Sequence, residues 1–332
     1  MANVIIGIHG LGNKPPAPTL EKWWKMAIIE GLQKHNYKTA LPKFEMVYWA
    51  DILYDKPLDL SEKDEKSPYY IDERYVPGGK ELPVENHDKR KKIVTFLNRQ
   101  LNRIFLNDDL SLNYSFITEA ILSKYFSDLE VYYAENTAET ENQNFKAKDL
   151  INNRLLKMLE KYKGYNIMLV SHSMGTIISF DVLTFLAQHI PVKTFVTIGS
   201  PLALPVVIGK IAAEQKRLQN GKTHMITPRC VTEHWYNLSD IHDKVAFNYD
   251  LADDFSENSN KVKPHDFLVV NNYEANGERN AHKSYGYLRT PEFSKILDEF
   301  IREEKLTIVQ KVYRHLASVI TQLKAKLFLR KG

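Results

Sequence analysis

Residues 166–183 read Asn-Ile-Met-Leu-Val-Ser-His-Ser-Met-Gly-Thr-Ile-Ile-Ser-Phe-Asp-Val-Leu, and this stretch decides the fold. Asn166–Val170 is a short apolar run of the kind that forms a buried parallel strand. The residues from Thr176 onward are apolar almost all round, which predicts a buried helix. Only Ser171–Gly175 separates the two. The sequence therefore predicts a sharp strand-to-helix turn with Ser173 at its centre.

Five further apolar runs resemble this strand in length and in their content of β-branched residues. They are Val4–Ile8, Phe44–Trp49, Thr194–Ile198, His234–Leu238 and Phe267–Val270. Apolar residues at i, i+3, i+4 spacing predict helices over Leu20–Leu32, Lys148–Tyr162, Thr176–Gln188 and Pro291–Glu304. This alternation predicts an α/β fold, with a mainly parallel sheet covered by helices on both faces.

Residues 52–144 interrupt the alternation. Ser61–Lys92 is dense in charge and contains proline and glycine, so we expect a loop there. Ile93–Tyr133 has a helical pattern and is rich in aromatic residues. A structureless loop of that length is unusual in a compact domain. We therefore expect a largely helical cap or lid over 52–144, inserted into a core made of residues 1–51 and 145–304.

The last segment, residues 305–332, carries seven lysine and arginine residues and no acidic residue. Its apolar residues fall at helical spacing, which predicts a basic amphipathic helix. Such a helix either packs on the core or lies on an anionic membrane surface, and the sequence leaves both readings open.

Composition excludes several classes of protein. With 43% hydrophobic residues, the 332-residue chain can bury a substantial core, and a net charge of +4 is too small to indicate nucleic-acid binding. Cys230 is the sole cysteine, so no internal disulfide can form, and we expect a small buried residue there. We expect no signal peptide, because the first apolar run is short and no basic segment precedes it, and no apolar run is long enough for a transmembrane helix. We expect a cytoplasmic protein, with membrane contact through 305–332 as the alternative.

Ser173 is the candidate nucleophile. On a strained strand-to-helix turn, the residues two before and two after the nucleophile approach closely, so both must be small. They are Ser171 and Gly175. The backbone N–H of Met174, at the start of the helix, can stabilise an oxyanion.

The first strand runs into His9-Gly10-Leu11-Gly12, a glycine-rich turn that exposes backbone N–H groups. We assign the second oxyanion donor to Leu11, with Gly12 as the alternative, and expect His9 to brace this loop. A dinucleotide-binding fingerprint would need a third glycine, and the position holds Pro15. Lys216 likewise stands where a phosphate-binding loop ending at Gly221-Lys222-Thr223 requires its first glycine.

Of the eleven histidines, His282 alone lies between the last strand and the closing helix, where the general base belongs in chain order. The acid should follow a late strand, and both Asp240 and Asp243 do so. We favour Asp243 and keep Asp240 as the alternative. His234 and His242 lie near these aspartates, but the spacing matches no metal motif, and we expect no metal.

The chain resembles the lipase and esterase branch of the α/β-hydrolase superfamily. The matching pieces are I-H-G-L-G at 8–12, L-V-S-H-S-M-G at 169–175, T-I-G-S-P-L at 197–202, W-Y-N-L-S-D-I-H-D-K-V at 235–245 and H-K-S-Y at 282–285. Two departures stand out. Ser171 replaces the first glycine of the turn, and the expected cap precedes the nucleophile strand.

The resemblance implies a serine hydrolase that cleaves a carboxylic ester of a small molecule or lipid through an acyl-serine intermediate, without a cofactor. The alternatives are an acyltransferase with the same triad and an inactive hydrolase fold used as a binding protein. If the aromatic cap forms an apolar pocket, medium or longer acyl chains should be preferred. The sequence leaves the oligomeric state open.

Overall fold

The computed structural model describes residues 1–79, 147–218, 225–243, 245–246 and 250–305. Six parallel strands form one sheet in the order β2-β1-β3-β4-β5-β6. The strands are β1 (Asn3–Ile8), β2 (Lys43–Val47), β3 (Asn166–His172), β4 (Val192–Ile198), β5 (Val231–Ser239) and β6 (Pro264–Leu268). The expected α/β fold with a parallel sheet is confirmed.

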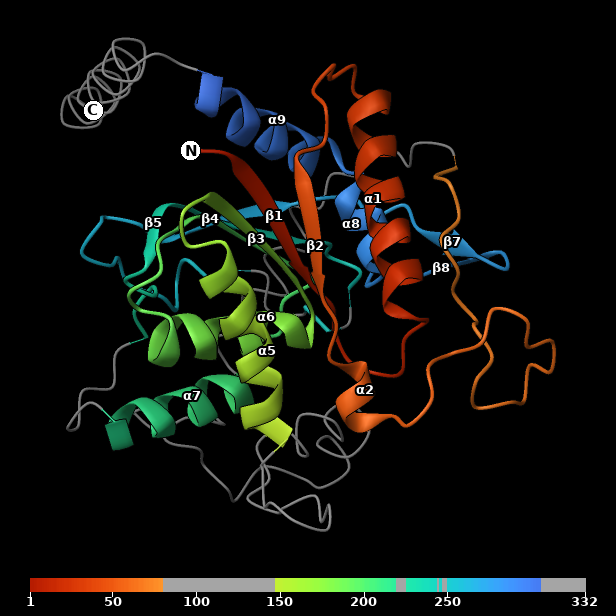
Figure 1. Ribbon diagram of the computed structural model, residues 1–332, viewed down its shortest axis with the longest axis horizontal. Coiled ribbons are helices and arrows are strands. Elements are labelled where there is room, and N and C mark those ends of the chain that lie inside the picture. The colour runs from red at the N-terminus through yellow and green to blue at the C-terminus, as the bar shows by residue number, and fades with distance from the viewer. Residues whose placement is uncertain (80–146, 219–224, 244, 247–249, 306–332) are drawn as a thin grey trace.

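Helices cover both faces of the sheet (Figure 1). One face carries α1 (Ala17–Lys34), α8 (Ser284–Leu288) and α9 (Pro291–Lys305). The other face carries α5 (Ala147–Lys161), α6 (Met174–Asp181) with its π-helical continuation Val182–Leu186, and α7 (Pro205–Leu218). Neighbouring side chains of a strand point to opposite faces. Accordingly, Ile5 of β1 belongs to one apolar cluster, whereas Val4 and Ile6 belong to the other.

Several strand boundaries differ by one to three residues from those expected, and two of the differences have a clear structural reason. Strand β2 ends at Val47 because the chain turns at Trp49 into the short helix α2 (Ala50–Leu53), and the Trp49 N–H bonds to the ring of His9. Strand β6 begins at Pro264, upstream of the expected start, because it pairs with β5 from Trp235 onward. A proline is tolerated there because β6 is an edge strand.

The short hairpin of β7 (Glu274–Ala275) and β8 (Glu278–Arg279) was not expected, nor were α7 and α8. Asn276 and Gly277 connect β7 to β8, and both have positive φ. The Asn-Gly pair is a recognised hairpin signal that identifies this turn in retrospect.

The strand order places a topological switch point between β1 and β3. From β1 the chain moves outward to β2, and from β3 it moves in the opposite direction through β4, β5 and β6. Loops at the carboxyl ends of two such strands diverge and leave a crevice, where open α/β sheets bind ligands. Gly10 follows β1 and Ser173 follows β3, so the sequence-predicted site residues meet at this crevice.

The described part of the expected cap, residues 52–79, begins with the end of α2 and continues from residue 54 as irregular chain that packs against α1 and α8. Glu30 of α1 accepts hydrogen bonds from the Gly78 N–H (2.6 Å) and the Tyr75 hydroxyl (2.8 Å). Arg289 pairs with Glu30 and donates to the Val76 carbonyl (2.8 Å). Its side chain is only 3% exposed, so this buried arginine holds the segment in place.

The aromatic part of the expected cap and the basic tail, residues 306–332, lie outside the described residues. Within the described ranges, no helix combines the length and the apolar character needed to cross a bilayer.

We predict that Arg289→Met lowers the free energy of unfolding by about 3–5 kcal/mol, because removing one partner leaves a partly buried carboxylate uncompensated. Arg302→Met is the matched control. Its side chain is 64% exposed and pairs with Asp298 on the same helix, so we expect a change below about 0.5 kcal/mol. Urea denaturation followed by circular dichroism measures both. Equally small losses of unfolding free energy in the two variants would show that Arg289 does not hold residues 54–79 in place.

Candidate active site

Ser173 lies on the tight turn between β3 and α6. Its backbone has φ 53° and ψ −126°, a conformation that non-glycine residues rarely adopt and that costs about 1–3 kcal/mol. Ser173 is also the N-cap residue of α6, so Met174 is the first residue of that helix. The first N–H groups of a helix lack intrahelical partners, which leaves the Met174 N–H available beside Ser173.

Close backbone contacts fix this turn. A Cβ atom at Gly175 would lie 2.7 Å from the His9 carbonyl oxygen and 2.8 Å from that of Ile8. A Cβ atom at Gly10 would lie 2.6 Å from the Cβ of Ser173. Both positions therefore require glycine. Ser171, which departs from the usual pattern, is fully buried, and its hydroxyl lies 2.7 Å from that of Ser179 on α6.

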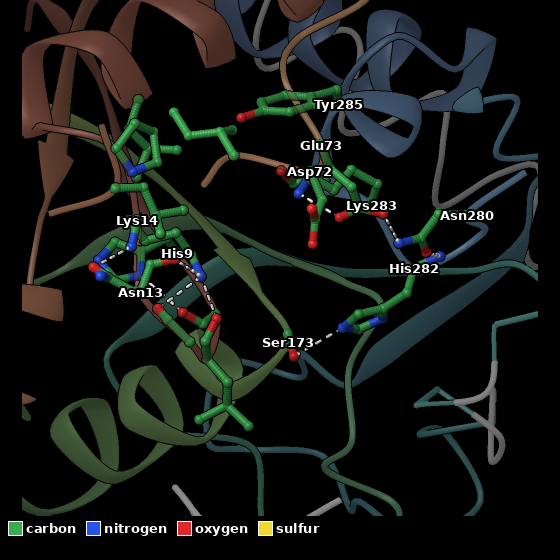
Figure 2. A pocket seen from close by; sticks show the side chains of 18 of the residues that line it. His9, Asn13, Lys14, Asp72, Glu73, Ser173, Asn280, His282, Lys283 and Tyr285 are labelled. Atoms are coloured by element: carbon green, nitrogen blue, oxygen red, sulfur yellow. Dashed lines mark hydrogen bonds and ion pairs between the residues drawn. The ribbon is translucent and has the colours of Figure 1, made fainter. Parts of the chain in front are cut away.

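Three of the predicted site residues meet in hydrogen-bond contact (Figure 2 shows Ser173 and His282). The Nε2 atom of His282 lies 3.0 Å from the Oγ of Ser173. The Nδ1 atom of His282 lies 2.9 and 3.0 Å from the two carboxylate oxygens of Asp243. The Asp243 carboxylate only accepts hydrogen bonds when ionised, so Nδ1 carries the proton. Nε2 then accepts the proton of the Ser173 hydroxyl.

Asp243 is buried, yet its charge is well satisfied. Its Oδ1 accepts the N–H groups of Val245 (2.8 Å) and Ala246 (3.1 Å), and its Oδ2 accepts the hydroxyl of Tyr287 (2.7 Å). Burial alone would raise the pKa of Asp243, but His282 and these hydrogen-bond donors outweigh burial and hold the pKa below its ordinary value. The carboxylate therefore stays ionised beside His282.

Asp240, the alternative acid, lies apart from this contact. Its Oδ2 accepts the Asn271 N–H (2.6 Å) and pairs with Arg279 (2.6 Å). Its Oδ1 accepts the His242 N–H (2.7 Å). The carboxylate thus ties together the loops after β5 and β6. In the structure, the carboxylate that contacts His282 is that of Asp243.

Several residues that hold Ser173, His282 and Asp243 in place were not recognised in the sequence. The ring of His172 donates Nε2–H to the backbone carbonyl of His282 (2.7 Å) and packs against its ring. Burial lowers the pKa of His172 well below its ordinary value, and the neighbouring His282 lowers it further, so the ring stays neutral. Asn280 accepts the N–H of His282 (2.9 Å), and Asn271 donates to the carbonyl of Lys283 (2.8 Å).

Gly199, at the end of β4, packs against the histidine–aspartate pair. It has φ +55°. A Cβ atom on Gly199 would lie 3.0 Å from the Oδ2 of Asp243 and 3.1 Å from the Nδ1 of His282. The structure therefore places Gly199 directly against the Asp243–His282 contact.

His9 braces the loop after β1. The backbone N–H of Trp49 donates to its Nε2 (3.0 Å), so the ring proton is on Nδ1, which donates to the Gly10 carbonyl (2.8 Å). The His9 ring also stacks on Trp49 at 4.8 Å. Carbonyl and N–H point in opposite directions across a trans peptide. Holding the Gly10 carbonyl therefore turns the Leu11 N–H to the other side.

Lys14 binds the next carbonyls of the same loop. Its ammonium donates to the carbonyl oxygens of Leu11 and Gly12, the latter at 2.9 Å. Gly12 has φ +79°, which lets the chain curl around the ammonium. Burial lowers the pKa of His9 well below its ordinary value, and the charge of Lys14 adds to this, so His9 stays neutral.

A cavity of about 590 Å³ opens beside Ser173 (Figure 2). It is lined by the loop at 9–15, by residues 280–285 around His282, and by part of the segment 58–73. Among the lining residues, Glu73 binds Lys283 (2.6 Å) and Asn280. The wall facing the candidate nucleophile is therefore polar.

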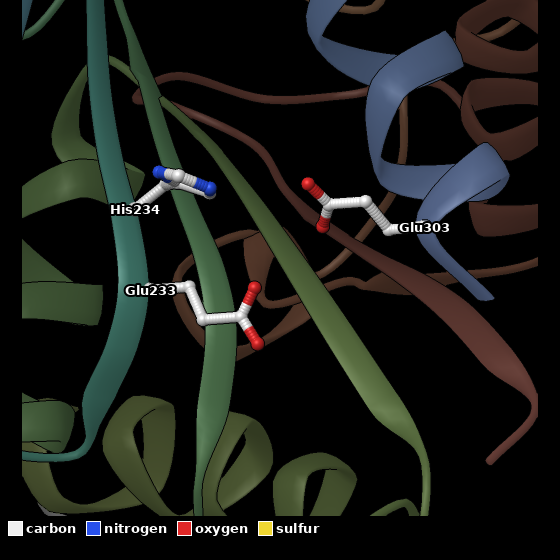
Figure 3. Close-up of side chains that lie close together, drawn as sticks. All are labelled: Glu233, His234 and Glu303. Atoms are coloured by element: carbon white, nitrogen blue, oxygen red, sulfur yellow. The ribbon is translucent and has the colours of Figure 1, made fainter. Parts of the chain in front are cut away.

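A second group of side chains lies far from this cavity along β5 and α9. Glu233, His234 and Glu303 offer ligand atoms within 4.8 Å of one another (Figure 3). The ammonium of Lys193 pairs with Glu303 (2.9 Å) and Glu233 (3.4 Å). We assign this group to an ion-pair network that links α9 to β4 and β5.

Comparison with known proteins adds no relative: no family model matches the chain, and no curated protein sequence matches it. The geometry of the site is therefore the basis for its chemistry. A hydroxyl that can lose its proton to a histidine oriented by a buried carboxylate is an activated nucleophile.

We predict that Gly199→Ala slows the reaction of Ser173 with an activated phenyl ester about 100-fold, because the new methyl group pushes Asp243 and His282 apart. Gly277→Ala is the matched control. It carries a similar backbone penalty at φ +80°, but nothing lies within 4 Å of its Cβ position. Stopped-flow release of phenol measures both variants. Equal rates in the two variants would show that Gly199 does not position Asp243 and His282.

Proposed function

We propose that this chain is a serine hydrolase of the α/β-hydrolase type that cleaves a carboxylic ester through an acyl-serine intermediate. The observation that carries the proposal is the unbroken contact from Asp243 through His282 to Ser173. The position of this contact at the switch point of a parallel sheet also supports the proposal. The motifs that resemble the lipase and esterase branch supply the same three residues in the same order.

In the acylation step, the Oγ of Ser173 attacks the ester carbonyl carbon while its proton passes to the Nε2 of His282. The carbonyl oxygen becomes an oxyanion, which we assign to the N–H groups of Leu11 and Met174. The tetrahedral intermediate then collapses. The bond to the leaving alkoxide breaks, and His282 delivers its proton to the departing oxygen.

In the deacylation step, a water molecule gives a proton to His282 and attacks the acyl carbon. Collapse of this second intermediate releases the carboxylic acid and returns the proton to Ser173. Throughout both steps Asp243 keeps its charge, which stabilises the imidazolium form of His282. The hydrogen bonds from Tyr287 and from the N–H groups of Val245 and Ala246 support that charge.

The rival functions differ from hydrolysis in what they require of the site. A binding scaffold would not need the strained Ser173 backbone, which has a cost in stability and places the hydroxyl against His282. Acyl transfer uses the same first step and replaces water by another acceptor. Hydrolysis is the simpler proposal because no acceptor subsite is needed for it.

We further propose that residues 52–144 act as a cap over this site. Support comes from the part of this stretch that lines the cavity, which includes Leu58, Pro68, Ile71 and Glu73. The contact of Glu73 with Lys283 links the segment directly to the loop that carries His282.

We predict that Ser173→Ala reduces ester turnover by about four to six orders of magnitude, because the nucleophile is lost. The wild-type chain should react with a fluorophosphonate probe at Ser173, located by peptide mass spectrometry, and the variant should not. Labelling at another residue, or substantial turnover by Ser173→Ala, would refute the proposed mechanism.

We predict that Asp243→Asn slows turnover by about four orders of magnitude, because the amide favours the wrong tautomer of His282. Asp240→Asn serves as the control. It weakens the pairing with Arg279 and should reduce stability more than it affects catalysis. Turnover and thermal midpoints of both variants test this. A larger catalytic loss in Asp240→Asn would reverse the assignment of the acid.

A further inference from the structure

Tyr285 lies on α8, three residues after His282, and lines the same cavity as Ser173. Figure 2 shows the two residues on different sides of that cavity. Nothing in the proposed reaction uses Tyr285, because its phenol is not part of the contact between Ser173, His282 and Asp243.

The ring of Tyr285 is held firmly. The residue is 2% exposed. Tyr75 and Trp23 pack edge-on against the ring, with centroids 5.8 and 6.2 Å away, and Tyr273 lies at 5.7 Å. The ammonium of Lys283 lies over the ring at 5.6 Å. A ring packed on this many sides has little freedom to redirect its hydroxyl.

The hydroxyl of Tyr285 has no hydrogen-bond partner among the described residues, unlike those of its neighbours. Tyr273 donates to the Arg74 carbonyl (2.6 Å), Tyr75 to Glu30 (2.8 Å) and Tyr287 to Asp243 (2.7 Å). Buried polar groups are normally hydrogen-bonded, because desolvation without a partner is costly. A phenylalanine would bury the same ring without that cost.

Tyr285 is one of the residues that line the cavity beside Ser173. A ligand in that cavity would therefore lie next to Tyr285 and could supply an acceptor for its hydroxyl. Burial raises the pKa of Tyr285, so the phenol keeps its proton and is a hydrogen-bond donor.

The charges around the cavity limit what this donor can bind. Its two lysines are already engaged, Lys14 by backbone carbonyls and Lys283 by Glu73. The remaining carboxylates of the lining, Glu65 and Asp72, would repel an anionic group. Leu20, Trp24 and Ile71 add buried apolar surface. The cavity thus suits a neutral group that combines hydrocarbon with an oxygen acceptor.

We propose that Tyr285 determines specificity by donating a hydrogen bond to a neutral oxygen of the substrate, such as an ether, hydroxyl or second carbonyl oxygen, away from the ester that reacts. This inference rests on the proposed function and names its substrate class: oxygenated esters in preference to plain hydrocarbon esters. A site that holds a buried donor discriminates against substrates that leave the donor unpaired.

The test uses isosteric esters in which oxygen replaces one methylene group. For the acyl side, p-nitrophenyl hexanoate is compared with the propoxyacetate, 3-ethoxypropanoate and 4-methoxybutanoate esters. For the alcohol side, butyl butyrate is compared with 2-methoxyethyl butyrate. The quantity measured is the ratio of kcat/KM for each oxygenated ester to that for its hydrocarbon partner, in wild type, Tyr285→Phe and Tyr273→Phe.

We expect Tyr285→Phe to lower this ratio by about 3- to 10-fold for at least one oxygenated ester, the effect of losing one neutral hydrogen bond. If the ratio falls for an acyl-side ester, the acyl group enters the cavity, and if it falls for the alcohol-side ester, the alcohol group does. Tyr273→Phe should keep the wild-type ratio, because its hydroxyl bonds to Arg74 and the residue does not line the cavity. Ratios in Tyr285→Phe that equal those of wild type in both arms would overturn the proposal.

Thermal unfolding gives an independent readout. Tyr285→Phe should not lower the Tm, because the lost hydroxyl leaves no protein group unpaired, and a drop larger than that of Tyr273→Phe would overturn the proposal. Fluorophosphonate labelling of the wild-type protein tests the proposed function separately from the role of Tyr285. Absence of labelling at Ser173 would refute the proposed function and this inference with it, whereas labelling with unchanged ratios would refute this inference alone.

Discussion

The backbone of α6 meets the carboxyl end of β1 at Gly175, where an added carbon atom would lie 2.7 Å from the carbonyl oxygen of His9. This contact fixes how far the helix can approach the sheet, and so it fixes Ser173, the residue immediately before the helix. Gly10 makes the reciprocal contact on the other side, against Ser173 itself. The first contact is with backbone atoms, and the second is with the Cβ atom of Ser173, which is bonded directly to the backbone, so both tolerate almost no displacement. The nucleophile and the loop after β1 are therefore positioned as one unit.

A network of buried hydrogen bonds extends this unit to the loops after β5 and β6. Tyr287 links the two aspartates, since its hydroxyl accepts the Asp240 N–H (2.9 Å) and donates to the Asp243 carboxylate (2.7 Å). Burial raises the pKa of Tyr287 well above its ordinary value, and the charge of Asp243 adds to the shift, so the phenol remains a donor. Polar networks of this kind specify one arrangement when every member is satisfied. The cost of burying two carboxylates is thereby offset by fixed partners.

The presence or absence of a hydrogen-bond partner within the protein separates structural from functional polar groups in this molecule. His9, His172, Lys14 and Asp240 each bind backbone or side-chain groups, and each holds a loop in place. Tyr285 lacks a partner among the described residues and lines the cavity. Where an otherwise satisfied site leaves one donor open, the open donor indicates where a ligand would supply the missing acceptor.

Local sequence was sufficient for the six strands of the main sheet, for four stretches of helix and for their order, but not for α7, α8 or the β7–β8 hairpin. The apolar run at 166–170, the small residues at 171 and 175 and the following helix predict the turn at Ser173, because strand, turn and helix patterns depend on neighbours in sequence. The position of His282 after the last strand followed from the same reasoning. The Asn276-Gly277 hairpin carried a comparable local signal that was overlooked.

The sequence favoured Asp243 and kept Asp240, at the end of the same strand, as the alternative, but only the tertiary structure shows which carboxylate contacts His282. The choice depends on contacts with residues distant in sequence: Arg279 and Asn271 take one carboxylate, and His282 and Tyr287 take the other. The roles of Gly199 and His172 and the open hydroxyl of Tyr285 arise in the same way. Each depends on differences of a few tenths of an ångström in the spacing between segments that only packing brings together, and no sequence periodicity encodes such differences.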